Sequence, residues 1–209
     1  MKTIRIILFL LCGLWGSFAQ AEMRYFFDLP LVGSELDAPK PTDDWDLGLE
    51  RGLSITPGIG IQFDQGQFQF DVLLEWFNHA SFPLISDDEV LEAEGYLVKF
   101  IGGVRVAKNW RIFAGFGMGD ADISNNYDSC RSPSGCPGGP WPYPPQSSSA
   151  NIKARLIGVA WSPQEHVEYS MGFQNITSDA LGFTDVNGTP YAVDELDLPT
   201  SFIAVRFIF

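Results

Sequence analysis

Eight segments of this chain alternate polar and apolar residues with a period of two, and the connections between them alternate in length. The segments are residues 24–32, 49–63, 67–78, 94–107, 110–119, 151–161, 166–174 and 200–209. The connections at 64–66, 107–109 and 162–165 are short, and those near 33–48, 79–93, 120–150 and 175–199 are long. Because successive side chains leave a strand on opposite faces, the pattern predicts an all-β fold of eight antiparallel strands.

In several predicted strands the charged residues share one face. Asp71 and Glu75 have the same parity in one strand, and Lys99 and Arg105 have the same parity in the next. A soluble barrel with an apolar interior also alternates, but short turns on one rim and long loops on the other favour an eight-stranded transmembrane β-barrel. Aromatic residues stand near both predicted rims, as expected at two lipid–water boundaries: Phe63, Trp110 and Phe209 by the turns, and Trp76, Tyr96 and Phe173 by the loops.

The charged face is expected to line the lumen. The predicted inward set is Arg24, Asp28, Asp71, Glu75, Lys99, Arg105, Arg111, Lys153, Arg155, Glu168 and Arg206. An eight-stranded barrel is just wide enough for its interior to be filled by side chains, so these groups should pair across it as a polar plug. A narrow ion pathway is the alternative. Bases outnumber acids seven to four in this set, which requires water, carbonyl or amide partners for the surplus.

Residues 1–21 have the features of a secretory signal peptide, with Lys2 and Arg5, an apolar stretch, and Ala19-Gln-Ala21 as the cleavage site. Residues 22–209 are then the barrel domain. Removing the signal takes away two bases and no acids, so the net charge moves from −13 to −15. A chain this acidic is a poor partner for nucleic acid, which requires clustered Lys and Arg.

The long loop at 120–150 is rich in proline and contains Cys130 and Cys136, which we expect to form a disulfide in an oxidising compartment. Trp141 and Tyr143 follow on a segment that favours extended conformations. This loop is the predicted site for a surface partner, and a simple shielding loop is the alternative. The many loop carboxylates form either a solvated rim or a surface for divalent cations that bridge lipopolysaccharide phosphates.

The last strand ends in an aromatic residue, with apolar residues at alternate positions before it: Ile203, Val205, Phe207 and Phe209. Together with the alternation of short turns and long loops, this ending resembles the small OmpA/OmpX-type and opacity-type barrels of the bacterial outer membrane. The resemblance implies a location in the cell outer membrane, an assembly signal in these four residues that the barrel-assembly machinery reads, and contact with outer-membrane lipid and lipopolysaccharide. It implies a role in envelope structure or surface interaction, without cofactor or metal.

One motif points to catalysis. His79-Ala-Ser81 is similar to the His-x-Ser of PagL-type lipid A deacylases, in which a glutamate orients the histidine, and Glu92 or Glu94 could match that glutamate. In such a site the histidine activates the serine for attack on an ester. Phe82 departs from the pattern, because those enzymes tend to have Asn after the serine. We expect a non-enzymatic barrel, with a lipid A-modifying esterase or a narrow pore as alternatives.

Overall fold

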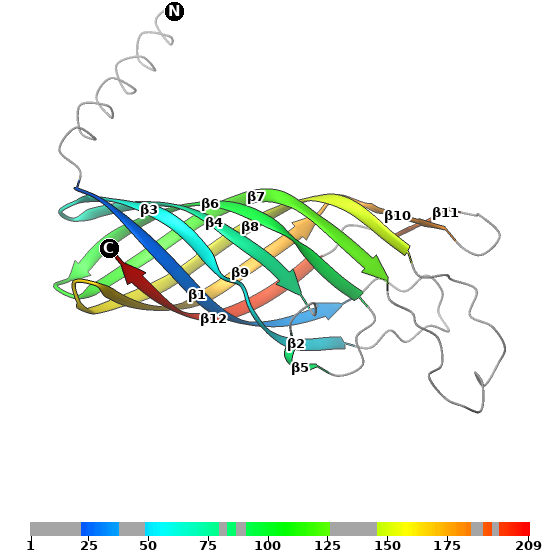
Figure 1. The fold of residues 1–209 in the computed structure, drawn as a ribbon, viewed down its shortest axis with the longest axis horizontal. Helices are drawn as coiled ribbons and strands as arrows, with labels where there is room; N and C mark the ends of the chain where they lie inside the picture. Colours follow the sequence, from blue (N-terminus) through cyan, green and yellow to red (C-terminus); the bar gives the residue numbers. More distant parts are fainter. Residues whose placement is uncertain are drawn as a thin grey trace, which may run out of the picture.

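Eight antiparallel strands close into a barrel in the computed structural model (Figure 1). The structure describes residues 22–37, 49–79, 83–86, 91–125, 146–184, 190–193 and 197–209. The ring strands are β1 (Glu22–Asp37), β3 (Gly58–Gln65), β4 (Phe68–His79), β6 (Leu91–Ala107), β7 (Trp110–Asn125), β8 (Gln146–Gln164), β9 (Val167–Ser178) and β12 (Asp197–Ile208). Their order is β12-β9-β8-β7-β6-β4-β3-β1, and β1 pairs back to β12. The predicted eight-stranded antiparallel barrel is confirmed.

The first and last ring strands close the barrel side by side. Phe26 lies opposite Ile208 and Ser34 lies opposite Thr200, so the pairing runs over nine residue pairs. The backbone amide of Phe209 donates a hydrogen bond to the carbonyl of Tyr25, at 2.8 Å. The start of β1 and the C-terminus therefore lie at the same rim, the rim that carries the short turns (Figure 1).

Two-residue turns join β3 to β4, β6 to β7, and β8 to β9. The first of these turns depends on Gly66, whose φ of 67° is in the left-handed region that glycine adopts without a Cβ penalty. The side chain of Asp64 accepts a hydrogen bond from the Gly66 amide at 3.1 Å. This geometry matches the local twist that a tight hairpin requires.

The strands differ from the prediction at the long-loop rim. Several ring strands run a few residues further than the alternation indicated, as in β7 to Asn125 and β8 from Gln146. The predicted second strand is two strands, β2 (Leu49–Ile55) and β3, because Pro57 lacks an amide hydrogen and interrupts the ladder. β2 pairs with β1 on one side and with β5 (Pro83–Ser86) on the other. A separate hairpin of β10 (Leu181–Thr184) and β11 (Pro190–Val193) stands at the same rim.

The outward face of the barrel is a continuous apolar band. Its exposed members include Tyr25, Ile59, Phe70, Leu74, Tyr96, Phe100, Ile112, Phe116, Ile157, Met171, Phe173, Ile203 and Phe209. Near the short-turn rim the rings of Trp110, Trp161 and Tyr169 stack along three neighbouring strands, with centroids 6.3 and 5.8 Å apart. Among the described residues, no helix is long and apolar enough to cross a membrane.

Apolar side chains also fill much of the interior, in two clusters that the sequence analysis did not predict. The cluster nearer the long loops contains Phe77, Ala93, Leu97, Ala121, Ile123, Ala150, Ile152, Ala154, Ile176 and Leu198. The cluster nearer the short turns contains Phe26, Leu73, Ile101, Phe113, Leu156, Ala160 and Ile208, with Phe202 packed against it. The lumen is therefore a mixed core, in which charged groups are enclosed by apolar side chains.

Candidate functional site

A network of two bases and three acids crosses the lumen in its short-turn half. Arg206 of β12 lies opposite Asp28 of β1 and Glu168 of β9 in the strand registers. Its guanidinium Nη2 is 3.0 Å from Oδ2 of Asp28, and its Nη1 is 2.6 Å from Oδ2 of Asp71 on β4. Arg111 of β7 also bonds Asp71, at 3.1 Å, and bonds Glu168 at 2.6 Å. Five strands are thus tied together by one set of buried charges.

The side chains of this network are buried. The relative exposure of its members is 1–5%. The guanidinium of Arg206 lies over the ring of Phe26, 3.9 Å from the centroid, and Gln69 donates a hydrogen bond to Asp71 at 3.1 Å. Ion pairs in such an environment depend on one another, because removal of one partner leaves an uncompensated charge away from water.

A second buried pair lies further toward the long loops. Nζ of Lys99 on β6 is 2.6 Å from Oε1 of Glu75 on β4, and both side chains are at most 6% exposed. The space between this pair and the Asp28–Arg206 pair is a cavity of about 30 Å³, walled in part by Phe113 and Phe202. That volume has room for only one or two water molecules.

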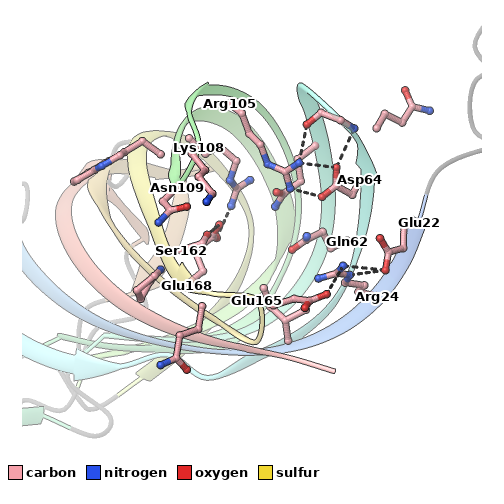
Figure 2. A pocket seen from close by; sticks show the side chains of 18 residues that line it. Glu22, Arg24, Gln62, Asp64, Arg105, Lys108, Asn109, Ser162, Glu165 and Glu168 are labelled. Carbon is pink, nitrogen blue, oxygen red and sulfur yellow. Dashed lines mark hydrogen bonds and ion pairs between the residues drawn. The ribbon is translucent and has the colours of Figure 1, made fainter.

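The short-turn end of the lumen widens into a polar mouth of about 890 Å³ (Figure 2). On one wall Arg105 forms an ion pair with Asp64 and donates to the carbonyl of Gly66 at 2.6 Å. On another, Arg24 bonds Glu22 at 2.9 Å and Glu165 at 3.0 Å. The mouth ends at Arg111 and Glu168 of the buried network, which also line it. Its open end is therefore separated from the rest of the lumen by the charged network.

The structure overturns the prediction that Lys153 and Arg155 point inward. Ala154 and Leu156 are the buried residues of this part of β8, while Lys153 and Arg155 are exposed on the outward face. Both bases stand at the long-loop end of the band, opposite Thr177 and Asn175 of β9. A lipid-facing base costs about 2–4 kcal/mol at the bilayer midplane but only about 0–1 kcal/mol near the interface. Their position near the rim makes the outward orientation tolerable.

This correction removes the expected surplus of inward bases. The nine other members of the predicted set do line the lumen or its mouth: Arg24, Asp28, Asp71, Glu75, Lys99, Arg105, Arg111, Glu168 and Arg206. Asp64, which the sequence analysis placed in a turn, is a tenth member through its pair with Arg105. The ten groups are five bases and five acids, and Lys108, Glu22 and Glu165 also line the mouth, so within the described residues bases do not outnumber acids there. The sequence signal for this inward position is the parity of Asp64, which is the same as that of the buried Gln62 in β3.

The candidate esterase residues lie at the edge of the described chain. The backbone of His79 ends β4 and pairs with Ala93, the residue after Glu92 in β6. Ser81 lies outside the described residues, as do the signal peptide, Cys130 and Cys136, and most of the acidic loop residues. Among the described residues, no cluster of three or more His, Cys, Asp or Glu side chains could hold a metal ion.

The four residues of the predicted assembly signal lie on β12 and just after it. Ile203 and Phe207 are exposed on the lipid side, Val205 is half-buried between them, and Phe209 is the most exposed at 76%. Their side chains form an apolar row at the seam with β1, where the barrel closes. The row is available to a partner that meets the strand from the membrane side.

Comparison with known proteins supports this architecture. The crystal structure of Neisserial surface protein A matches with a TM-score of 0.53 at 13% identity, over 88% of this chain and 97% of that one. The crystal structure of Ail, the attachment invasion locus protein of Yersinia pestis, matches with a TM-score of 0.50 at 11% identity, over 90% and 99%. Both are small eight-stranded outer-membrane β-barrels.

This chain is an outer-membrane β-barrel. Its exposed apolar band, aromatic rows and closed strand ladder agree with that location, because a spanning sheet must pair every backbone group. No protein-family model matches the chain, and no curated protein matches it. At these identities the likeness is one of fold. The function therefore has to be argued from the side chains of the barrel.

Proposed function

We propose that this barrel is a closed structural wall of the outer membrane, acting in envelope structure or surface interaction, and that it neither conducts solutes nor modifies lipid. The observation that carries the proposal is the lumen itself. Buried ion pairs, the two apolar clusters and a cavity of only about 30 Å³ between the ion pairs support closure. Passage of a solute would require several buried pairs to break together.

The surface role is assigned to the long-loop rim. Loop 120–150, with the predicted Cys130–Cys136 disulfide, is the proposed contact for a surface partner, and lipopolysaccharide is the proposed neighbour in the membrane. Phe209 and the alternate residues before it are proposed as the signal for the barrel-assembly machinery. Their lipid-side exposure at the closing seam supports that role.

Liposome swelling tests the closed wall. We expect vesicles that contain the refolded protein to swell in small sugars at the rate of protein-free vesicles, with a general porin as the positive control. Swelling at a porin-like rate would refute closure. Deletion of residues 126–145, which lie between β7 and β8, supplies the control for gating by the loop, since closure by the lumen core predicts no swelling for that variant either.

Mass analysis of lipid A distinguishes the proposed structural role from the alternative of an esterase. Cells with and without the protein should give the same lipid A, whereas a deacylase removes an acyl chain. If a chain is lost, Ser81→Ala and His79→Ala should abolish the loss only if these residues are the catalytic ones. A loss that depends on them would replace the structural proposal.

A further inference from the structure

A groove crosses the lipid-facing wall where β8, β9, β12 and β1 lie side by side. It has a volume of about 660 Å³, and its lining is almost entirely apolar. Ile157, Phe173 and Ile203 are strongly exposed along it, Phe173 at 72%. Large exposed side chains cover most of the rest of the outward face, so a hollow of this size has a local cause.

The cause is a row of small residues between large ones. In the strand registers Ile157 lies opposite Phe173, Phe173 opposite Ser201, and Ser201 opposite Gly33. The next row toward the short turns has only large residues, with Met171 among them. Ser201 and Gly33 therefore leave a gap beside Phe173. The hollow extends across the neighbouring strands, from Ile157 on β8 to Gly33 on β1.

Positive charge lies at the long-loop end of this groove. Arg155 is two residues beyond Ile157 on the same face of β8, and Lys153 is two residues beyond Arg155. Among the described residues, none forms an ion pair with Arg155. Lys153 has only a loose pair with Asp179, at 3.4 Å, and both of those side chains are more than half exposed.

These bases are unusual in a chain with a net charge of −13. Other charges on this side of the rim are acidic: Asp120 and Asp197 are exposed near Lys153, one on β7 and one on β12. Of these charged residues, Arg155 lies closest to the apolar band. The apolar groove begins two residues further along β8, at Ile157, so a basic group and an apolar hollow lie next to each other on the lipid-facing side.

We infer that this face is a binding site for one phosphorylated glycolipid of the outer leaflet, the lipid A part of lipopolysaccharide. Arg155 and Lys153 bind a phosphate, and the groove beside Phe173 holds an acyl chain. The long-loop end of such a barrel faces the cell exterior, which is the leaflet that contains this lipid. The inference rests on the outer-membrane location and is independent of whether the lumen is closed.

Native mass spectrometry of the detergent-refolded protein, titrated with purified diphosphoryl lipid A, tests the phosphate contact. Arg155→Gln and Lys153→Gln together should weaken retention of the lipid by about ten-fold or more, as expected for loss of charge-assisted hydrogen bonds. Lys108→Gln is the matched control, because Lys108 is an exposed base at the opposite rim. Heat-dependent gel mobility verifies that each variant is folded. Unchanged binding by the double variant would overturn the site.

Two further measurements fix the ligand and the groove. Ser201→Phe should fill the gap and weaken binding with both bases intact, while Ser201→Ala should bind as the wild type does. Lipid A without its phosphates should bind no better to the wild type than to the double variant. Equal retention of phosphatidylglycerol would overturn the assignment to lipid A, and equal binding by Ser201→Phe would overturn the groove.

Discussion

The guanidinium of Arg206 meets the carboxylate of Asp71 across the lumen, with Nη1 2.6 Å from Oδ2, although the two residues are 135 positions apart in the chain. Arg206 is on the closing strand β12, and Asp71 is on β4, which is not its neighbour in the ring. The contact therefore joins two strands that no backbone hydrogen bonds join directly. It ties opposite walls of the barrel together and fills the interior between them.

Removal of Arg206 should destabilise the barrel more than removal of any base at the mouth. Arg206→Ala leaves Asp28 and Asp71 buried without their main partner, and such a loss costs about 3–5 kcal/mol. Arg105→Ala is the control, because its side chain is 36% exposed and its loss should cost about 1 kcal/mol or less. Urea unfolding in lipid vesicles measures both. Equal costs would mean that the network does not act as a buried unit.

The Lys99–Glu75 pair should be replaceable as a pair but not singly. Lys99→Met alone leaves the buried carboxylate of Glu75 without its partner, and we expect the free energy of unfolding to fall by about 3–5 kcal/mol. Lys99→Met combined with Glu75→Gln should recover most of that loss, since the neighbouring clusters are apolar. A double-mutant cycle by the same unfolding assay gives the coupling. Additive single effects would contradict a direct buried contact.

Gly66 should resist substitution because of its backbone and not because of crowding. Its φ is 67°, and a Cβ there would meet no atom within 4 Å. Gly66→Ala should therefore cost about 1–2 kcal/mol from the left-handed conformation alone, and Gly66→Asn should cost less. Gly182→Ala is the matched control, because that position is also open. If both Ala variants unfold at the same urea concentration, the turn does not require glycine.

Asp179, just beyond β9, should titrate at an unusually low pH. The hydrogen bond from Asn151 lowers the pKa of the Asp179 carboxyl, and the charge of Lys153 adds to that shift. Because the folded pKa is the lower one, any stabilisation by this group is present above the unfolded pKa and is lost as the pH falls through the folded pKa.

Carboxyl chemical shifts followed by NMR in micelles measure this titration. Asn151→Ala should raise the Asp179 midpoint more than Lys153→Met does, because the hydrogen bond has the larger effect. A wild-type midpoint at or above the ordinary value for aspartate would contradict the contact.

The strand count and the closure of the barrel could be predicted from the sequence, because period-two alternation records which face each side chain takes. β8 shows where that record is ambiguous. Lys153 and Arg155 have one parity and Ala154 and Leu156 the other, and the apolar parity of Ala154 and Leu156 predicted the lipid-facing side. The large residues Ile157 and Val159 share the parity of Lys153 and Arg155, and they indicate the outward face more reliably. Small residues on the opposite parity leave room inside the barrel for aromatic rings from other strands.

Other features depend on contacts between distant strands. Leu97 and Ile101 share the inner face of β6 with Lys99, so the charge pattern alone does not reveal that apolar clusters fill part of the lumen. The ladder break at Pro57 and the pairing of β2 with β5 require knowledge of which segment lies alongside. The pairing of Asp64 with Arg105 likewise appears only once the turns are in place.

Ion conductance across a planar bilayer tests the closed lumen most directly. If the buried network and the apolar clusters close the lumen as proposed, a single refolded barrel inserted under applied voltage should leave the current at the level of the bare membrane. A porin inserted in the same membrane verifies the sensitivity. Discrete, sustained current steps from the wild-type protein would contradict the account.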